Sequence, residues 1–249
     1  MKVSLITVSY NSEDTIEETF LSVFSQKDVD LEYIVIDGGS KDNTLAIIEQ
    51  YKDRIDYFLS EKDKGIYDGM NKGLKMATGD VIGILNSDDV LAGETILSDV
   101  VGAFEQTNAD GLYGDLVYVN RDDLFKVTRK WVSGNYKDGD FKKGWMPPHP
   151  TFYVKRDVYE RYGVFNLNFS SAADYEIMLR FIHKHKIRVA YLPKVMVKMR
   201  QGGKSNASLS NRLKANREDR KAWEVNGLKP GPFTLLFKPL SKITQFIKK

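Results

Sequence analysis

The sequence predicts an α/β fold with a mostly parallel central sheet and helices on both of its faces. Residues 1–90 alternate four short apolar runs with three segments whose apolar residues recur at helical spacing. Such alternation implies parallel strands joined by right-handed helical crossovers. Each apolar run also ends in polar residues, and the carboxyl ends of parallel strands meet at one sheet edge, where α/β proteins bind ligands. We therefore expect a ligand site in the N-terminal half.

The composition is that of a globular protein that can bury a sizeable core. The chain has 249 residues, of which 42% are hydrophobic and 29% charged, enough for one α/β domain or two small ones. A net charge of +3 is too small to indicate nucleic-acid binding. The absence of cysteine excludes disulfides, thiolate metal sites and cysteine nucleophiles, and it fits a cytoplasmic protein. The apolar run at residues 3–8 is too short for a signal peptide or a membrane span.

The first strand and the first helix are expected at residues 2–9 and at about 12–24. The strand is apolar at most positions, and a polar turn follows it. Ser12 can cap the helix, whose inward face is formed by apolar residues at helical spacing. These inward residues are Ile16, Phe20, Val23 and Phe24.

The next elements continue the alternation up to residue 85. Strands are expected at residues 31–36, 55–59 and 81–85, because these runs are apolar and bounded by polar or glycine-containing turns. Helices are expected at residues 42–51 and 67–76, each beginning after a polar loop. The last of these strands is apolar at nearly every position and is therefore expected to be buried on both faces.

The second half of the chain is less regular. Apolar runs and helical periodicity still predict elements there, and residues 139–150 are expected to form a loop rich in glycine, proline and aromatic residues. The expected helices are 94–106, 156–162, 172–184 and 209–225, and the expected strands are 111–119, 125–131, 151–154 and 188–199. No linker divides the chain before about residue 228, so we expect one domain over 1–228 and a separate tail over 229–249.

Asp88 and Asp89 follow the buried strand 81–85 directly. Two adjacent carboxylates at the carboxyl end of a strand suit Mg²⁺ or Mn²⁺, especially an ion shared with a diphosphate. The alternative is a polar turn in which one aspartate caps the helix that follows.

Five short motifs together resemble the family 2 glycosyltransferases, which are inverting enzymes of the Rossmann-like GT-A fold that use nucleotide sugars. The similarity is to the members that assemble bacterial polysaccharides, and it covers roughly residues 1–205. Five motifs in the right order are far more specific than any one of them. They are Thr7-Val8-Ser9-Tyr10-Asn11, Val35-Ile36-Asp37-Gly38-Gly39-Ser40, Gly65-Ile66-Tyr67-Asp68-Gly69-Met70-Asn71-Lys72-Gly73, Leu85-Asn86-Ser87-Asp88-Asp89 and His149-Pro150-Thr151-Phe152.

The resemblance implies that residues 1–90 bind the nucleotide sugar and that residues 91–228 carry the acceptor and catalytic side. Tyr10, neighbouring backbone and Asp37 would hold the base and ribose, although Asp37 also fits a plain turn. Asp68 and Lys72 would reach the donor from one helix, although residues four apart can simply pair. The implied donor-binding residues are Thr7, Val8, Tyr10, Asp37, Asp68, Asn71, Lys72, Asn86 and Asp88.

The resemblance also implies a metal ligand and a catalytic base. Asp89 corresponds to the metal ligand of the family's Asp-x-Asp motif, but this chain has Ser87-Asp88-Asp89, which leaves open which carboxylate contacts the ion. Asp174 corresponds to the base, with Glu176 as the fallback, although an acid in the first turn of a helix also suits the helix dipole. His149 would lie on the acceptor side, and its alternative is an inert loop histidine.

The implied function is transfer of a sugar from a nucleoside-diphosphate sugar, expected to be a UDP-sugar, to a glycan or lipid-linked acceptor with Mn²⁺ or Mg²⁺. Two rivals are a nucleotidyltransferase, which would normally carry a glycine-rich loop after the first strand, and a non-catalytic carbohydrate-binding module. The Gly202-Gly203 loop is expected to close over the diphosphate, or else to be a surface turn.

The tail at residues 229–249 interleaves lysines with aromatic and aliphatic residues, and no acid follows Glu224. This pattern predicts an amphipathic segment on an anionic membrane, and thus a cytoplasmic protein that can lie on the inner face of the membrane. The alternatives are a terminal helix packed on the domain and a dimer contact.

Overall fold

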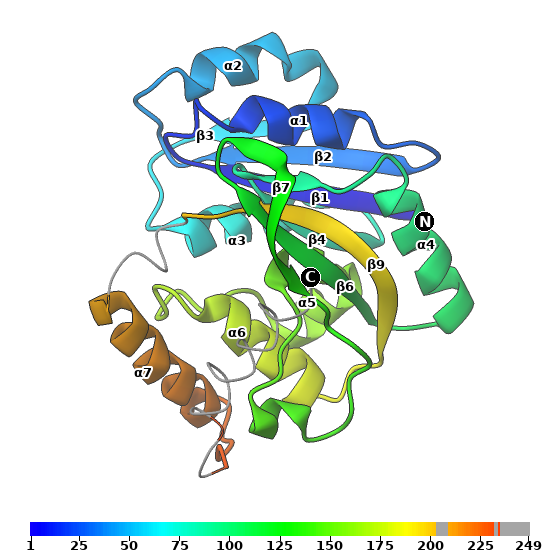
Figure 1. Ribbon diagram of the computed structural model, residues 1–249, viewed down its shortest axis with the longest axis vertical. Coiled ribbons are helices and arrows are strands. Elements are labelled where there is room, and N and C mark those ends of the chain that lie inside the picture. The colour runs from blue at the N-terminus through cyan, green and yellow to red at the C-terminus, as the bar shows by residue number, and fades with distance from the viewer. Residues whose placement is uncertain (203–208, 232–233, 235–249) are drawn as a thin grey trace.

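In the computed structural model, one curled sheet crosses the molecule and helices cover both of its faces (Figure 1). The structure describes residues 1–202, 209–231 and 234. Most of the predicted tail, and the Gly203-Lys204 part of the predicted closing loop, lie outside the described residues. The α/β fold class is confirmed, while the division at residue 228 stays a prediction.

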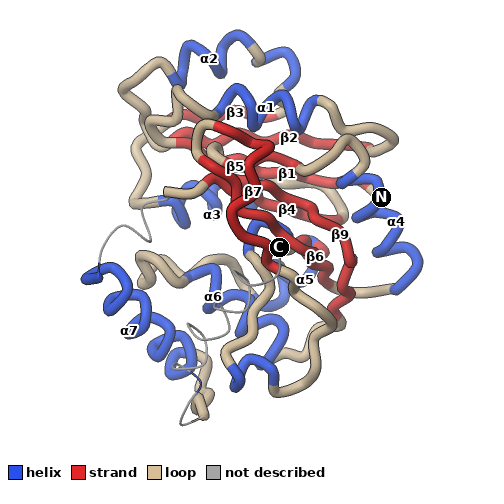
Figure 2. The backbone as a smooth tube through the Cα atoms, viewed as in Figure 1, coloured by secondary structure: helices blue, strands red, loops and turns tan. Residues whose placement is uncertain are grey.

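The sheet has nine strands in the order β3-β2-β1-β4-β8-β6-β9-β5, and β7 pairs with β6. Figure 2 draws the strands in red. The strands are β1 Lys2–Ser9, β2 Asp30–Asp37, β3 Tyr57–Ser60, β4 Val81–Asn86, β5 Asp89–Leu91, β6 Gly111–Asn120, β7 Asp123–Trp131, β8 Tyr153–Lys155 and β9 Val189–Arg200. The four N-terminal strands are parallel, as predicted. In the second half only β6 and β9 pair in parallel, and the other pairs are antiparallel.

The helices divide between the two faces of the sheet. They are α1 Ile16–Phe24, α2 Thr44–Gln50, α3 Ile66–Met76, α4 Ile96–Thr107, α5 Arg156–Tyr162, α6 Ala173–Met178 and α7 Leu209–Val225. Buried residues of α1, α2 and α4 pack with Val3 and Leu5 on one face. Those of α3, α5, α6 and α7 pack with Ile6 and Val8 on the other (Figure 1). Alternate residues of β1 thus bury opposite faces of the sheet, as a strand covered on both sides requires.

Short helical turns fill the connections of the second half. A 3₁₀ turn, η1, covers Lys52–Arg54, and two more, η2 at Asp140–Lys143 and η3 at His149–Thr151, lie in the segment that was predicted to be a plain loop. The predicted helix 172–184 begins as α6 and continues as a π-helix, η4, over Leu179–Lys184. Strand β5 was not predicted, because three residues carry no readable periodicity and their pairing partner β9 is remote in sequence.

Glu32 ties the N-terminal ends of the parallel strands together. Its carboxylate accepts hydrogen bonds from the Ser4 hydroxyl at 2.5 Å, the Thr78 backbone N–H at 2.8 Å and the Lys2 ammonium at 2.9 Å. Burial alone raises the pKa of Glu32, but these hydrogen bonds outweigh burial and lower it from 4.5 to about 2. The charged form of Glu32 is therefore the form that stabilises the fold.

Glu32→Gln is expected to destabilise the fold by on the order of 2 kcal/mol at pH 7, because the amide NH₂ cannot accept these hydrogen bonds. A lowered carboxyl pKa stabilises above about pH 4.5, and this contribution is lost as the pH falls from about 4.5 to 2. Urea unfolding of both proteins at pH 7 and at low pH measures the effect. Glu49→Gln, at an exposed ion pair with Lys52, is the matched control and should change little. A difference between wild type and Glu32→Gln that stays constant with pH would contradict the assignment.

Candidate active site

The carboxyl ends of β1, β2 and β4 bring several of the predicted donor-binding residues together. Strand register pairs Val8 with Ile36 on one side and with Asn86 on the other. Val8 and Ile36 pack against Tyr67 of α3 in one apolar cluster. Asn86 lies at the same end of β4 and, two residues after Ile84 of that cluster, on the same face of the sheet. The first turn of α3 therefore lies over the strand ends that were predicted to bind the donor.

The Ser87-Asp88-Asp89 turn is fixed by hydrogen bonds from two other elements. Residues of the Ser12-to-α1 segment bind it three times. They are the Ser12 hydroxyl to the Ser87 hydroxyl at 2.8 Å, the Thr15 hydroxyl to the Ser87 carbonyl at 2.9 Å, and the Thr19 hydroxyl to the Asp89 carbonyl at 2.8 Å. From the end of β9, the Arg200 guanidinium donates to the Asp88 carbonyl at 2.8 Å. The alternative to a metal site, an aspartate that caps the following helix, is wrong, because Asp89 begins strand β5 and the N-cap residue of α4 is Thr95.

The side chains of this turn leave buried oxygen atoms without partners. Asp89 is fully buried, and its Oδ2 accepts a long hydrogen bond of 3.3 Å from Asn86 Nδ2. Asp89 Oδ1 and Asn86 Oδ1 are both buried and find no hydrogen-bond partner among the residues that the structure describes. Burial, and then the neighbouring charge of Asp88, raise the pKa of Asp89 well above its usual range. A divalent cation would satisfy these hard oxygen atoms and neutralise the two adjacent carboxylates.

The donor set therefore fits Mg²⁺ or Mn²⁺. Among the described residues there is no group of three or more histidine, aspartate or glutamate side chains placed to hold a metal. An ion at Asp89 would need most of its ligands from substrate phosphates and water. Mg²⁺ commonly binds in this way, through one or two carboxylates and the phosphates of its substrate.

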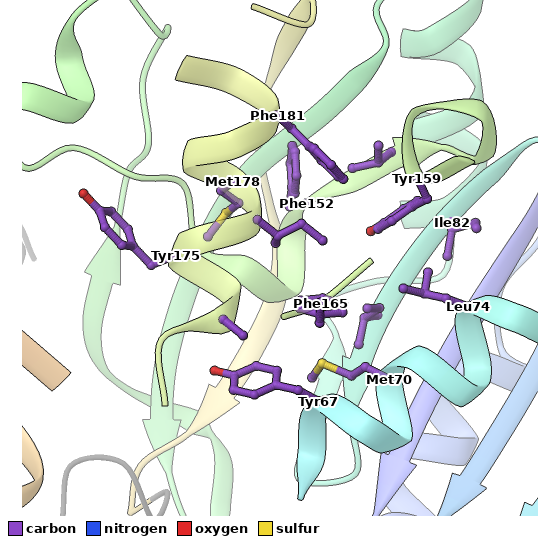
Figure 3. Packing of buried hydrophobic residues seen from close by; sticks show 14 of the residues in the cluster. Tyr67, Met70, Leu74, Ile82, Phe152, Tyr159, Phe165, Tyr175, Met178 and Phe181 are labelled. Carbon is purple, nitrogen blue, oxygen red and sulfur yellow. The ribbon is translucent and has the colours of Figure 1, made fainter. Parts of the chain in front are cut away.

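Asp174 lies in the first turn of α6 and faces the first turn of α3. The Tyr67 hydroxyl donates a hydrogen bond of 3.2 Å to Asp174 Oδ1. Burial, followed by the charge of Asp174, raises the pKa of Tyr67, so its hydroxyl stays protonated and remains a donor. The ring of Tyr67 stacks on Phe165, with centroids 5.7 Å apart (Figure 3). Asp174 is only partly buried.

His149 joins this group from η3. Its ring lies edge-on to Phe165, with centroids 5.8 Å apart. Burial lowers the pKa of His149, and the charge of Asp174 opposes that change. A lowered histidine pKa means a neutral imidazole at pH 7. The structure thus brings together Tyr67, His149 and Asp174, whose elements are far apart in the sequence.

Asp37 is more enclosed than a donor-binding role suggests. It is fully buried, and its carboxylate accepts hydrogen bonds from the hydroxyls of Ser9, Ser40 and Ser60 and from the backbone N–H groups of Gly39 and Ser40. These contacts support the turn reading of Asp37, and its donor-binding role stays a prediction.

Asp63 is a candidate that the sequence reasoning missed. A Cβ atom added to Gly38 would lie 2.5 Å from Asp63 Oδ2, so the Asp63 carboxylate occupies the space beside the strand-β2 turn. It also lies 3.6 Å from the position of a Cβ at Gly69 on α3. In the sequence, Asp63 could have been noticed because it lies two residues before Gly65, the first residue of the third motif. Its position beside Gly38 is seen only in the folded chain.

Three predicted donor-binding residues of α3 have partners within the protein. The Lys72 ammonium forms ion pairs with Glu61 at 2.9 Å and with Asp68 at 3.5 Å. Asp68 and Lys72 therefore form the i,i+4 pair that was the alternative to donor binding. The Asn71 amide exchanges two hydrogen bonds of 2.9 Å with the backbone of Phe165. Their contact with a donor stays a prediction.

Thr7 and Tyr10 differ in exposure. The Thr7 side chain is fully buried and accepts a hydrogen bond from Tyr33 on the face of the sheet opposite Val8. A contact of Thr7 with the donor would therefore have to come from its backbone. Tyr10 is 49% exposed just past the end of β1. The fallback base Glu176 is 2% exposed and bound by Arg180 and Asn226, which leaves Asp174 as the more accessible carboxylate.

The chain belongs to glycosyltransferase family 2. Residues 4–163, more than half of the chain, match the family model described as Glycosyl transferase family 2. Uncharacterized glycosyltransferase Rv1514c of Mycobacterium tuberculosis is 32% identical over 180 residues, which are 72% of this chain and 68% of the relative. The PGL/p-HBAD biosynthesis glycosyltransferase of Mycobacterium bovis is 27% identical over 211 residues, or 82% of this chain and 78% of the relative.

Solved structures show the same GT-A-like fold. The crystal structure of S. aureus TarS 1-349 in complex with UDP-GlcNAc has a TM-score of 0.71 at 21% identity, over 91% of this chain and 65% of that one. A longer TarS chain is covered to 44%. Mannosyltransferase PcManGT from Pyrobaculum calidifontis, in complex with GDP-Man and Mn²⁺, has a TM-score of 0.66 at 19% identity, over 94% of this chain and 67% of that one. In the part of the chain that the structure describes, no helix combines the length and apolar character needed to cross a membrane.

Proposed function

We propose that the protein is an inverting glycosyltransferase that moves a sugar from a nucleoside-diphosphate sugar, with UDP as the nucleotide, to a glycan or lipid-linked acceptor of cell-surface polysaccharide synthesis. One observation carries this proposal. Asp89, with an unpartnered buried oxygen, is bonded to Asn86, which lies beside Val8. Val8 packs in one cluster with Tyr67, and Tyr67 is bonded to Asp174. A chain of contacts at the carboxyl ends of β1 and β4 thus joins the candidate ion site to the candidate base.

Asp174 is the base in this proposal. It takes the proton of an acceptor hydroxyl as that oxygen bonds to the anomeric carbon, and the bond from that carbon to the diphosphate breaks. A single displacement inverts the configuration. The Tyr67 hydroxyl orients the carboxylate through Oδ1, which leaves Oδ2 for the acceptor. His149, whose pKa is lowered by burial, would lie on the acceptor side.

Asp89, supported by Asn86 and Asp88, would hold the divalent cation. When bound, such an ion neutralises the charge of the departing diphosphate. Two observations support this assignment. The structure of the mannosyltransferase PcManGT contains Mn²⁺. In this chain, the unpartnered oxygen atoms of Asp89 and Asn86 are suitable ligands for such an ion. Asp63, beside the turn that follows β2, would face the base and ribose, and the buried Asp37 would support this contact by fixing that turn.

A nucleotide-sugar screen tests the proposal. Because a ligand that binds the native state raises its stability, a UDP-sugar at about 100 times its Kd is expected to raise Tm by roughly 5–10 °C in the presence of Mn²⁺. UDP-GlcNAc, UDP-glucose, UDP-galactose and GDP-mannose form the panel, and release of nucleoside diphosphate measures turnover. A larger shift with GDP-mannose would reject UDP. Binding of a donor without turnover on any acceptor would favour the rival carbohydrate-binding module.

A lipid-linked acceptor would bring the protein to the inner face of the membrane. We propose the basic tail at residues 229–249 for this contact, from its sequence pattern alone. Flotation with anionic vesicles that is unchanged by deletion of the tail would reject it.

A further inference from the structure

Helix α7 binds the segment that presents Asp174. The carboxylate of Glu218 accepts hydrogen bonds from the Ser170 hydroxyl at 2.6 Å and from the Ser171 backbone N–H at 2.8 Å. The Ser170 N–H at 3.1 Å and the Ser171 hydroxyl at 3.0 Å complete the set. One side chain of α7 thus binds the backbone N–H and the hydroxyl of two consecutive serines. These residues directly precede Ala172, the N-cap residue of α6.

Ala172 gives this helix start no cap of its own. An alanine side chain cannot accept a hydrogen bond from the first turn, and no side-chain cap hydrogen bond is present there. The Glu218 carboxylate brings a negative charge to this helix start and accepts hydrogen bonds from four donor groups just before the turn that carries Asp174. Burial raises the pKa of Glu218, but the hydrogen bonds from the two serines lower it more, so the carboxylate stays charged.

A second contact from α7 holds the other side of Asp174. The Trp223 indole N–H donates to the Tyr175 hydroxyl at 2.9 Å, and both side chains are buried. Tyr175 belongs to the same buried cluster as Tyr67, and Figure 3 shows its ring directed away from the Tyr67 ring. Asp174 therefore lies between Ser171 and Tyr175, two residues that α7 fixes independently.

We propose that Glu218 is a positioning residue for Asp174: it fixes the start of α6 so that the Asp174 carboxylate keeps its place opposite Tyr67. This inference rests on the proposed role of Asp174 as the base. Glu218, like Asp174, lies outside residues 4–163, the segment that matches the family model. Small displacements of a reacting group are costly, since an error of about 1 Å can lower the rate about 100-fold.

Glu218→Gln tests the proposal, because the amide NH₂ cannot accept from either serine. We expect kcat to fall by about 10- to 100-fold while KM for the donor and the Kd for UDP stay within about twofold. Glu218→Asp, which keeps the charge on a shorter side chain, should recover part of kcat. Glu224→Gln is the matched control, since Glu224 is an exposed glutamate of the same helix.

A double-mutant cycle with Asp174→Asn separates positioning from general stability. If Glu218 acts through Asp174, then Glu218→Gln should lower kcat little further in the Asp174→Asn protein. An equal loss of kcat in both backgrounds, or a loss that only follows the folded fraction, would overturn the proposal. Amide hydrogen exchange at residues 170–176 needs no substrate and should be faster in Glu218→Gln than in Glu224→Gln. Full turnover by Asp174→Asn would reject the proposed base, whereas a loss in Asp174→Asn without one in Glu218→Gln rejects only the positioning role.

Discussion

Asp174→Asn is expected to lower transfer by roughly 10²–10⁴-fold, because an amide cannot take the proton of the attacking hydroxyl. The variant keeps the size of the side chain and can still accept the hydrogen bond of 3.2 Å from Tyr67. Binding of the nucleotide sugar should therefore change little. Initial rates at saturating donor, together with calorimetric binding of UDP, measure the two quantities separately.

Asp157→Asn is the control for this substitution. Asp157 also lies in the first turn of a helix, α5, but it forms an exposed ion pair with Arg161. If the two variants lost the same small amount of activity, Asp174 would be only a favourable acid at a helix start. Transfer by Asp174→Asn near the wild-type rate would remove it from the mechanism.

Asp89→Asn is expected to lower metal-stimulated activity by roughly 10²–10³-fold, comparable to the loss of one group that stabilises the transition state. The same variant should be more stable than wild type without metal, because it removes a fully buried carboxylate from beside Asp88. Mn²⁺ titrations of activity and metal-free thermal unfolding measure the two effects, which have opposite signs.

Asp88→Asn is the comparison that assigns the ion. Asp88 is less buried than Asp89, and its backbone carbonyl is already bound by Arg200. If Asp89 is the direct ligand, Asp88→Asn should weaken the Mn²⁺ response less than Asp89→Asn does. Unchanged metal dependence in Asp89→Asn would count against an ion at this position. If Asp88→Asn weakened the Mn²⁺ response more than Asp89→Asn does, Asp88 would be the direct ligand and Asp89 the supporting residue.

The N-terminal half of the fold follows closely from the sequence. Strand β1 has the bounds that the residue patterns predicted, and α3 and β4 each differ from the prediction by one residue, because their apolar patterns are regular and their boundaries carry turn residues. The parallel order β3-β2-β1-β4 follows from helical crossovers that are local in sequence. The confirmed fold class rests on this regular half.

The remaining features depend on contacts between segments remote in sequence. Strand β5 exists because β9, more than 100 residues later, pairs with it. The contacts of Glu218 with Ser170 span 48 residues, and the contact of Tyr67 with Asp174 spans 107. No local pattern encodes such pairs. The family resemblance could therefore identify Asp89 and Asp174 as candidate site residues from the sequence. Asp63 and Glu218 could be identified only from contacts in the folded chain.

The bonds between α7 and the start of α6 also set a boundary for protein engineering. A hybrid enzyme that borrows the acceptor-facing half of a relative would have to import α7 together with α6, because Glu218 and Trp223 bind partners that lie before and after Asp174. A junction between Tyr175 and Glu218 would combine the Asp174 turn of one protein with the α7 support of another. A junction beyond Asn226, whose amide binds Glu176, keeps the two together.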